Sequence, residues 1–310
     1  MISFAKILVG VDLSHADRLI SHDLSVRCEQ AVQKGIALAQ GGNGKLTFTA
    51  VIDISEQALH LIETDDSGKK SKVQLEAEEV LGTLVERAKA EGVDADAKVL
   101  FGPSAESMIK FVEAGKFTLV VVGRKSKSSL TDLLFGRTAI KLLRKCPVPV
   151  YVAKPDPART IESTLVADDF TEVGEQILDA GVQLARMFQT RLHVVHVVES
   201  GEDYKLAGSG IPMGDIEKLR DSELERAKTI LQERLSRTDY RTLELGTVVH
   251  VEQGSAEKVI CDKLRENEVD LLVMGTAGRT GLSAMIMGNT AERILAEMDC
   301  SLLAIKPKSK

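Results

Sequence analysis

The sequence repeats itself at a spacing of 152 residues, the distance that separates Gly123 from Gly275. Each of these glycines ends a run of four apolar residues, at 119–122 and at 271–274. At the same offset and without a gap, identical residues recur in five further pairs: Leu130 and Leu282, Gly136 and Gly288, Thr138 and Thr290, Lys154 and Lys306, Pro155 and Pro307. In a chain of 310 residues, a period of this length indicates a tandem duplication of one domain.

Two segments further upstream extend the repeat towards the beginning of each half. Residues 102–106 are echoed at 254–257, and residues 7–12 at 164–169. Between the halves, Pro155 and Pro157 favour a linker, because proline continues neither a helix nor a central strand. We therefore expect one domain over residues 1–155 and a second over residues 160–310.

Each repeat alternates short apolar runs with amphipathic stretches, which predicts strands alternating with helices. The expected strands are 6–11, 46–52, 97–101, 119–122 and 148–152, then 165–167, 192–198, 248–251, 271–274 and 302–305. The expected helices are 25–40, 72–91, 104–114 and 138–145, then 173–188, 215–236, 256–266 and 290–298. The fold class is thus α/β, with two tandem doubly wound five-stranded parallel sheets. We expect the last strands of the two repeats to meet, because each sheet would otherwise expose an apolar edge.

The composition of the chain argues against several classes of partner. A net charge of −6, no Trp and 4% aromatic residues disfavour a nucleic-acid partner. The sequence has no apolar run of membrane-spanning length and no signal-peptide pattern, and its four cysteines are not spaced for a zinc site or a disulfide framework. We expect a cytoplasmic protein that contacts neither nucleic acid nor membrane and holds no metal site of its own.

The carboxyl ends of the strands are where an open α/β sheet binds ligands. In the second repeat this rule selects Asp168 and Asp169 after the first strand, residues 196–198 at the second, and Gly275 after the fourth. A glycine-rich segment follows Gly275, and the helix expected at its end offers unpaired N–H groups to an anion. The alternative is an ordinary glycine-rich turn with an Asn/Thr helix cap.

The glycine-rich segment resembles a known nucleotide signature. Gly275-x-x-Gly278, nine residues and then Gly288-Asn289-Thr290 resemble the pattern Gly-x2-Gly-x9-Gly-(Ser/Thr) of the universal stress protein (UspA) family. The strand endings at Asp12 and Asp169 resemble the family's adenosine element, and residues 146–150 resemble the start of its last strand. The resemblance covers nearly the whole chain twice and is greatest to the tandem members. It implies the adenine nucleotide alpha-hydrolase-like fold, with the two domains packed as an internal pseudo-dimer.

The resemblance also implies a ligand and its contacts. The second domain would bind an adenine nucleotide, with ATP first among the candidates, and Mg²⁺ could accompany a triphosphate. Asp169 would contact the ribose, and Ala167, Asp168 and Val197 would line the adenine pocket. The phosphates would lie against Gly275, Gly278, Arg279, Gly288, Asn289 and Thr290. Two positions depart from the family pattern, because Asp168 stands where Thr or Val is usual and Asn289 takes the Ser/Thr place.

The first domain departs further from the signature. A second site there would comprise Asp12, Val51, Gly123, Gly136 and Thr138. Ser126 replaces the second glycine and Arg137 replaces the Ser/Thr, so the basic loop could attract an anion while its bulk fills the pocket. A filled pocket excludes a ligand whatever the charge around it, so we give the shape of the site more weight than its charge. We therefore expect a degenerate first site and one nucleotide per chain.

Three functions compete: a nucleotide-binding regulatory or sensing module of the stress response, a slow ATPase or nucleotide hydrolase, and a ligand-free dimerisation scaffold. The glycine-rich loop favours the module over the scaffold. The sequence shows no placed general base or nucleophile, a group worth ~10²–10⁴ in rate, which favours the module over the enzyme. His193 and His196 lie three apart on one strand, so they face opposite sides and would not share a metal. A homodimer is a further expectation.

Overall fold

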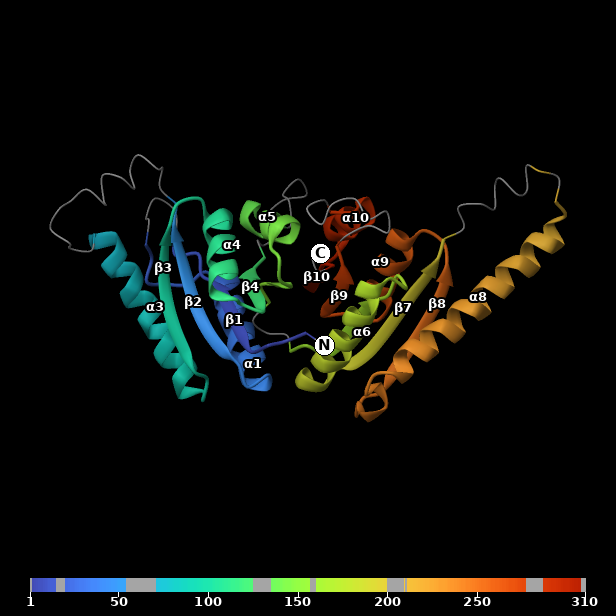
Figure 1. Ribbon diagram of the computed structural model, residues 1–310, viewed down its shortest axis with the longest axis horizontal. Coiled ribbons are helices and arrows are strands. Elements are labelled where there is room, and N and C mark those ends of the chain that lie inside the picture. The colour runs from blue at the N-terminus through green and yellow to red at the C-terminus, as the bar shows by residue number, and fades with distance from the viewer. Residues whose placement is uncertain are drawn as a thin grey trace. The chain divides into compact units, whose positions relative to one another are not determined.

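A computed structural model describes residues 2–14, 20–53, 71–124, 135–156, 160–199, 209, 211–276 and 287–307. The chain packs as two compact units, whose elements are labelled in Figure 1. The first unit contains residues 2–159 together with 301–310, and the second contains residues 160–300.

The first unit is a doubly wound α/β sandwich. Its strands β1 to β5 are parallel and lie in the order β3-β2-β1-β4-β5. Helices α1 and α3 pack against one face of this sheet, and α4 and α5 against the other. The strands are β1 (Lys6–Gly10), β2 (Lys45–Ile52), β3 (Ala95–Phe101), β4 (Leu119–Gly123) and β5 (Val150–Ala153). The helices are α1 (Val26–Gly41), α3 (Lys72–Ala90), α4 (Ser104–Gly115) and α5 (Arg137–Lys145).

The last strand of the second repeat, β10 (Ser301–Ile305), belongs to this first unit. It pairs antiparallel with β5, and Leu303 lies opposite Tyr151. Beside this ladder the Lys306 ammonium donates to the Cys146 carbonyl at 3.1 Å. The last strands of the two repeats thus meet as the sequence predicted, and β10 covers the apolar edge of β5.

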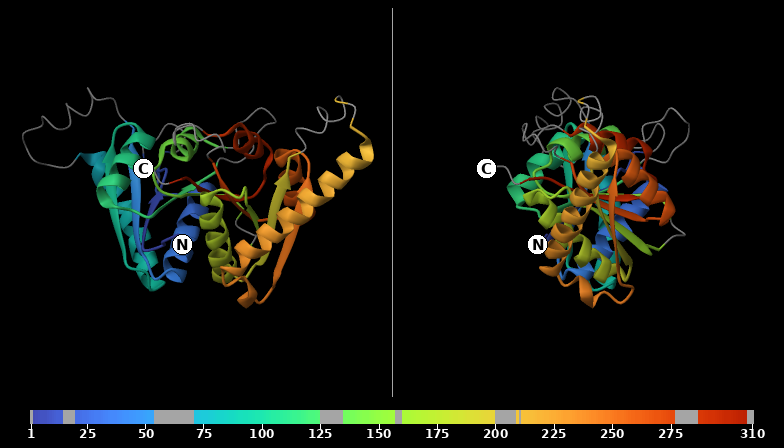
Figure 2. Two further views of the ribbon diagram at one scale, coloured as in Figure 1. Left: turned by 45° about the vertical axis from the view of Figure 1, so that its right-hand side comes forward. Right: turned by 90° about the vertical axis from the view of Figure 1, so that its right-hand side faces the viewer.

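The second unit repeats the same winding. Its parallel strands lie in the order β9-β6-β7-β8. Helices α6 and α8 cover one face, and α9 and α10 lie on the other (Figure 2). The strands are β6 (Ser163–Ala167), β7 (Arg191–Val198), β8 (Thr247–Gln253) and β9 (Leu271–Gly275). The helices are α6 (Glu172–Phe188), α8 (Met213–Ser236), α9 (Ala256–Glu266) and α10 (Asn289–Glu297), with a 3₁₀ turn, η1, at Tyr240–Thr242.

The helix ends follow from local chemistry. The Thr171 hydroxyl caps α6 by accepting the Gly174 N–H at 3.3 Å, and Ser71 caps α3 by accepting the Gln74 N–H at 3.2 Å. Gln189 ends α6 in the left-handed conformation, with φ 53°. Every strand and helix expected from the sequence is present, and their ends agree within two residues.

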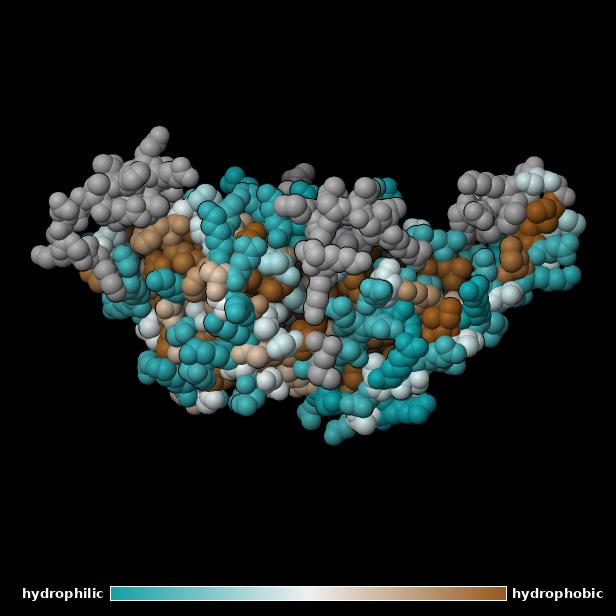
Figure 3. Space-filling view, in the orientation of Figure 1, coloured by the Kyte–Doolittle hydropathy of each residue, from teal (hydrophilic) through white to brown (hydrophobic). Residues whose placement is uncertain are grey.

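Helix α8 extends beyond the end of β8 (Figure 1). Exposed apolar side chains, among them Met213 and Leu219, lie near the start of this helix, where Figure 3 shows apolar surface. Its second half buries Ala227, Leu231 and Leu235 at a spacing of four residues, and this part packs on β7 and β8. Among the helices described here, none is long and apolar enough to cross a membrane.

Candidate functional site

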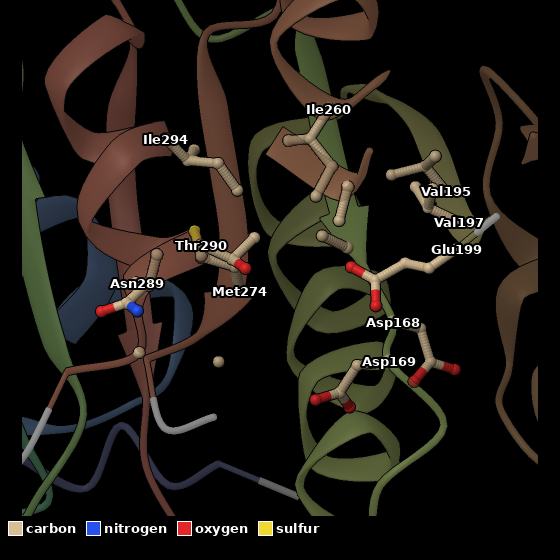
Figure 4. Close-up of a pocket in the computed structure, with 15 residues that line it drawn as sticks. Asp168, Asp169, Val195, Val197, Glu199, Ile260, Met274, Asn289, Thr290 and Ile294 are labelled. Atoms are coloured by element: carbon tan, nitrogen blue, oxygen red, sulfur yellow. The ribbon is translucent and has the colours of Figure 1, made fainter. Parts of the chain in front are cut away.

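A cavity of about 270 Å³ lies in the second unit, at the carboxyl ends of β6 and β9 (Figure 4). The chain leaves β6 towards β7 on one side, whereas β9 adjoins β6 on the other, so the strand order reverses here. This is the place where open α/β sheets bind ligands. The cavity is lined by Ala167, Asp168, Asp169, Val195, Val197, Glu199, Ala256, Ile260, Met274, Gly275, Gly288, Asn289, Thr290, Ala291 and Ile294.

The structure brings most of the residues expected in the second-repeat site to this one cavity. They come from three separate parts of the chain: the end of β6, the end of β7, and the segment that joins β9 to α10. Gly278 and Arg279 lie outside the described residues. The eight that line the cavity are Ala167, Asp168, Asp169, Val197, Gly275, Gly288, Asn289 and Thr290.

The apolar wall of the cavity was largely missed by sequence reasoning. Val195 lies two residues before Val197 on β7, so strand alternation could have identified it. Ile260 and Ile294 come from α9 and α10, and nothing local in the sequence indicates that they meet. Figure 4 shows both isoleucines together with Val195 and Val197 around one end of the cavity. This apolar surface suits the flat ring of a base.

The start of α10 forms a second wall. Gly288 precedes the helix with φ −68° and ψ 146°, and its N–H donates to the Thr276 carbonyl at 2.9 Å. Among the described residues, the N–H groups of Asn289, Thr290 and Ala291 meet no acceptor. Free N–H groups at a helix start attract anions, so this end of the cavity suits phosphate oxygens.

Asp169 lies across the cavity from Asn289 and Thr290 (Figure 4). One of its carboxylate oxygens, Oδ1, accepts the Thr171 N–H at 3.0 Å and the Thr171 hydroxyl at 2.6 Å. This short turn holds the half-buried carboxylate beside the cavity. A carboxylate fixed in this way can accept hydrogen bonds from hydroxyl groups of a ligand.

Asp168 lines the cavity, but its carboxylate faces away from it. Atom Oδ2 lies 3.1 Å from Arg234 Nε on α8, and Oδ1 accepts the Phe170 N–H at 2.9 Å. Burial raises the pKa of this carboxyl to about 6, and the nearby Arg234 opposes the shift. The additional carboxylate that departs from the family pattern is therefore paired within the protein and does not face a bound anion.

The two histidines of β7 contact different residues. His196 Nδ1 lies 2.7 Å from the Asp168 carbonyl, and its ring stacks on Phe170 with centroids 3.5 Å apart. His193 Nδ1 lies 3.1 Å from His250 Nε2 on β8. Both β7 histidines are buried, and no cluster of three or more metal-ligating side chains occurs in the described parts of the chain.

In the first repeat, Asp12 makes the same turn as Asp169, because its Oδ1 accepts the Ser14 N–H at 3.1 Å and the Ser14 hydroxyl at 2.5 Å. Its other oxygen, however, accepts a hydrogen bond from Arg27 at 2.7 Å. The matching oxygen of Asp169 has no such arginine, since Val173 stands at the position of Arg27. The first-repeat carboxylate is thus already paired.

The remaining first-repeat candidates lie on the expected elements, with Val51 in β2, Gly123 in β4, and Gly136 and Thr138 at the start of α5. Met108, the counterpart of Ile260, packs closely over Gly10: a Cβ added to Gly10 would lie 2.8 Å from the Met108 side chain. The unbranched methionine side chain reaches further than isoleucine, and it fills space next to β1 at the place where Ile260 lines the cavity of the second unit.

The family model of the universal stress protein family matches residues 3–154 and again 160–306. Two tandem α/β units with this match define the class, and the chain belongs to the universal stress protein family. Within that family it is similar to universal stress protein E. It is 28% identical to the Salmonella typhi protein, over 90% of both chains. It is 32% identical to the Haemophilus influenzae homolog, over 66% of this chain and 67% of that protein.

Solved structures that span nearly the whole chain agree on the fold. A putative universal stress protein from Pseudomonas aeruginosa has a TM-score of 0.67 and 20% identity, covering 97% of this chain and 93% of its own. Two further structures each cover about half of this chain. One is a universal stress protein in complex with cAMP, with 20% identity, a TM-score of 0.37 and 98% of its own chain covered. The other is an Arabidopsis thaliana family protein with AMP bound, with 17% identity, a TM-score of 0.36 and 95% of its own chain covered.

Proposed function

We propose that the second repeat binds an adenine nucleotide in the cavity between β6, β9 and α10. The protein then acts as a regulatory or sensing module of the stress response, in the cytoplasm, rather than as a catalyst. One observation carries the proposal: eight residues that the family resemblance implies for nucleotide binding, distant in the sequence, surround a single cavity. Each of its walls suits a different part of a nucleotide.

The base would lie against the apolar wall formed by Val195, Val197, Ile260 and Ile294. The ribose hydroxyls would donate to Asp169, and the phosphates would accept from the N–H groups at the start of α10. The acidic side chains Asp169 and Glu199 repel a triphosphate, so ATP would bind together with Mg²⁺, which offsets part of that charge.

A calorimetric titration of the purified protein with ATP, with and without Mg²⁺, tests this proposal. We expect a micromolar dissociation constant, about −8 kcal/mol, and weaker binding of GTP. AMP and cAMP serve as less charged probes of the same cavity. Absence of binding by all of these adenine nucleotides would contradict the proposal and favour the ligand-free scaffold.

Release of inorganic phosphate from ATP separates the module from the slow ATPase. We expect no turnover above the buffer control. Sustained phosphate release that is lost together with binding in Gly288→Val would assign an enzymatic function to the same site.

A further inference from the structure

Behind the cavity, the second repeat buries a charged pair. The Arg234 side chain is 10% exposed and the Asp168 side chain 0%, and Arg234 Nε lies 3.1 Å from Asp168 Oδ2. Removing two charges from water costs several kcal/mol per ion, which the mutual attraction only partly returns. The fold therefore gains little stability from this pair.

The first repeat shows which residues the fold accepts at the same positions. Helix α3 aligns with α8, because buried residues and an ion pair to the preceding helix recur at one spacing. Arg237 Nη1 lies 2.9 Å from Glu175 Oε1, and Arg87 Nη1 lies 2.7 Å from Glu29 Oε1. The buried pairs are Ala77 and Ala227, Leu81 and Leu231, Val85 and Leu235. In this alignment Leu84 stands at the position of Arg234.

The positions of Asp168 and of its neighbours Phe170 and His196 are also apolar in the first repeat. Val11 stands at the position of Asp168, Leu13 at that of Phe170 and Ala50 at that of His196. Val11, Leu13, Ala50 and Leu84 are all buried. One copy of the fold thus builds this region from apolar residues, so the second copy does not need charges there in order to fold.

Arg234 contacts three of the four residues that join β6 to α6. Besides pairing with Asp168, its guanidinium donates to the Thr171 carbonyl at 2.7 Å and lies 5.6 Å from the centre of the Phe170 ring. Phe170 itself has φ 62°, a left-handed backbone that costs free energy in a residue other than glycine. The one residue of the four that faces the cavity without such a contact is Asp169.

We propose that Arg234 is a positioning residue of the nucleotide site, which fixes residues 168–171 and so holds Asp169 against the ligand. The role in binding rests on the function proposed above, whereas the effect on the loop does not depend on any ligand. Through Arg234, helix α8 is coupled to the residues that adjoin the cavity.

The proposed coupling should also depend on the charge of Asp168, and therefore on pH. Burial raises the pKa of its carboxyl to about 6; Arg234 lowers it, and Asp169 and Glu175 raise it further. The ring of His196 also faces the residue, at its carbonyl. Protonation below this pH leaves a neutral Asp168 that no longer holds the guanidinium, so the loop should loosen as the pH falls.

The double variant Asp168→Val/Arg234→Leu copies the residues of the first repeat and tests the proposal. Amide hydrogen exchange of the protein without ligand is measured at Thr171 and Gly174, whose N–H groups donate to Asp169 Oδ1 and Thr171 Oγ1, atoms that the variant leaves in place. We expect exchange at both amides to become about tenfold faster, a change typical of coupled neighbours. Arg237→Leu, which removes the exposed pair with Glu175, is the matched control and should leave both rates unchanged.

A second test is the affinity for cAMP, measured between pH 7.5 and pH 5.5. The phosphodiester of cAMP does not titrate in this range, and a purely structural role of Arg234 would not make the affinity depend on pH. We expect the wild-type affinity to fall by about threefold on acidification, because a carboxyl with a pKa of about 6 is still about one quarter charged at pH 5.5. The double variant should bind about tenfold more weakly at pH 7.5 and lose the pH dependence. Arg234→Lys, which keeps the charge but not the planar fork, should lie between the two.

The two proposals fail differently. If the wild type binds no nucleotide, the proposed function is wrong, and hydrogen exchange still decides the role of Arg234. If the wild type binds but the double variant exchanges and binds like it, Arg234 is not a positioning residue. An unfolded double variant, seen by circular dichroism, would also overturn the proposal, because the apolar pair would then be unable to replace the charged one.

Discussion

Two adjacent carboxylates at the end of β6 have opposite surroundings. Asp169 is half-buried and lies beside the cavity, while Asp168 is buried and pairs with Arg234. From their position after a strand, the sequence predicts both as residues of the candidate site, and both line the cavity. It could not say which one faces the ligand, because the partner that turns Asp168 away comes from α8, and neither the repeat nor the glycine-rich signature marks Arg234.

At the same scale, Asp169→Asn should weaken ATP binding by about tenfold or more, because a hydrogen bond to a charged group contributes roughly 1.5–3 kcal/mol. The amide keeps an oxygen for the turn to Thr171, so the loop should persist. Asp12→Asn in the first repeat is the matched control, because that carboxylate already pairs with Arg27. Equal loss of affinity in both variants would place the ribose elsewhere.

The histidine pair of β7 and β8, in which His193 is buried, predicts acid sensitivity of the fold. Burial lowers the pKa of His193 from 6.5 to about 4, and the neighbouring His250 adds to the shift. Between pH 6.5 and about 4, the unfolded chain therefore binds a proton at His193 that the folded chain does not bind. The free energy of unfolding should fall as the pH drops through this range.

His193→Gln removes this titration while keeping a polar partner for His250. Urea denaturation across that pH range should show a shallower decline in the variant than in the wild type. The exposed His22→Gln provides the control. A decline as steep in His193→Gln as in the wild type would mean that other groups cause the acid sensitivity.

At the scale of elements, the sequence was sufficient for the order of strands and helices. Buried parallel strands give near-continuous apolar runs, and the amphipathic stretches between them have helical spacing, so both signals are local. The direction in which β10 pairs with β5 is not local, since it depends on two strands about 150 residues apart in the chain. The packing of α8 behind the site has the same non-local origin.

The start of α10 carries the next prediction. Gly288 has φ −68°, which valine also adopts, so Gly288→Val should leave the helix intact while placing a side chain at the anion end of the cavity. Nucleotide binding should be lost without a change in the thermal midpoint of unfolding. Gly136→Val at the start of α5, with φ −59° and open space for a Cβ, is the matched control and should bind like the wild type.

At the scale of the whole molecule, the two repeats share a fold and differ in what they offer a ligand. The second repeat has a cavity with an accessible carboxylate and an open helix start. In the first, Arg27 pairs with the equivalent carboxylate, and Met108 packs closely over Gly10. We therefore propose that the second repeat alone binds the nucleotide, and that the first is a degenerate copy that has kept the fold.

The stoichiometry of ATP binding, measured by isothermal titration calorimetry with Mg²⁺ present, tests this assignment most directly. We predict one nucleotide per chain, with the site eliminated by Gly288→Val and retained in Gly136→Val. A stoichiometry near two, or loss of the site in Gly136→Val rather than in Gly288→Val, would contradict the assignment of the ligand to the second repeat.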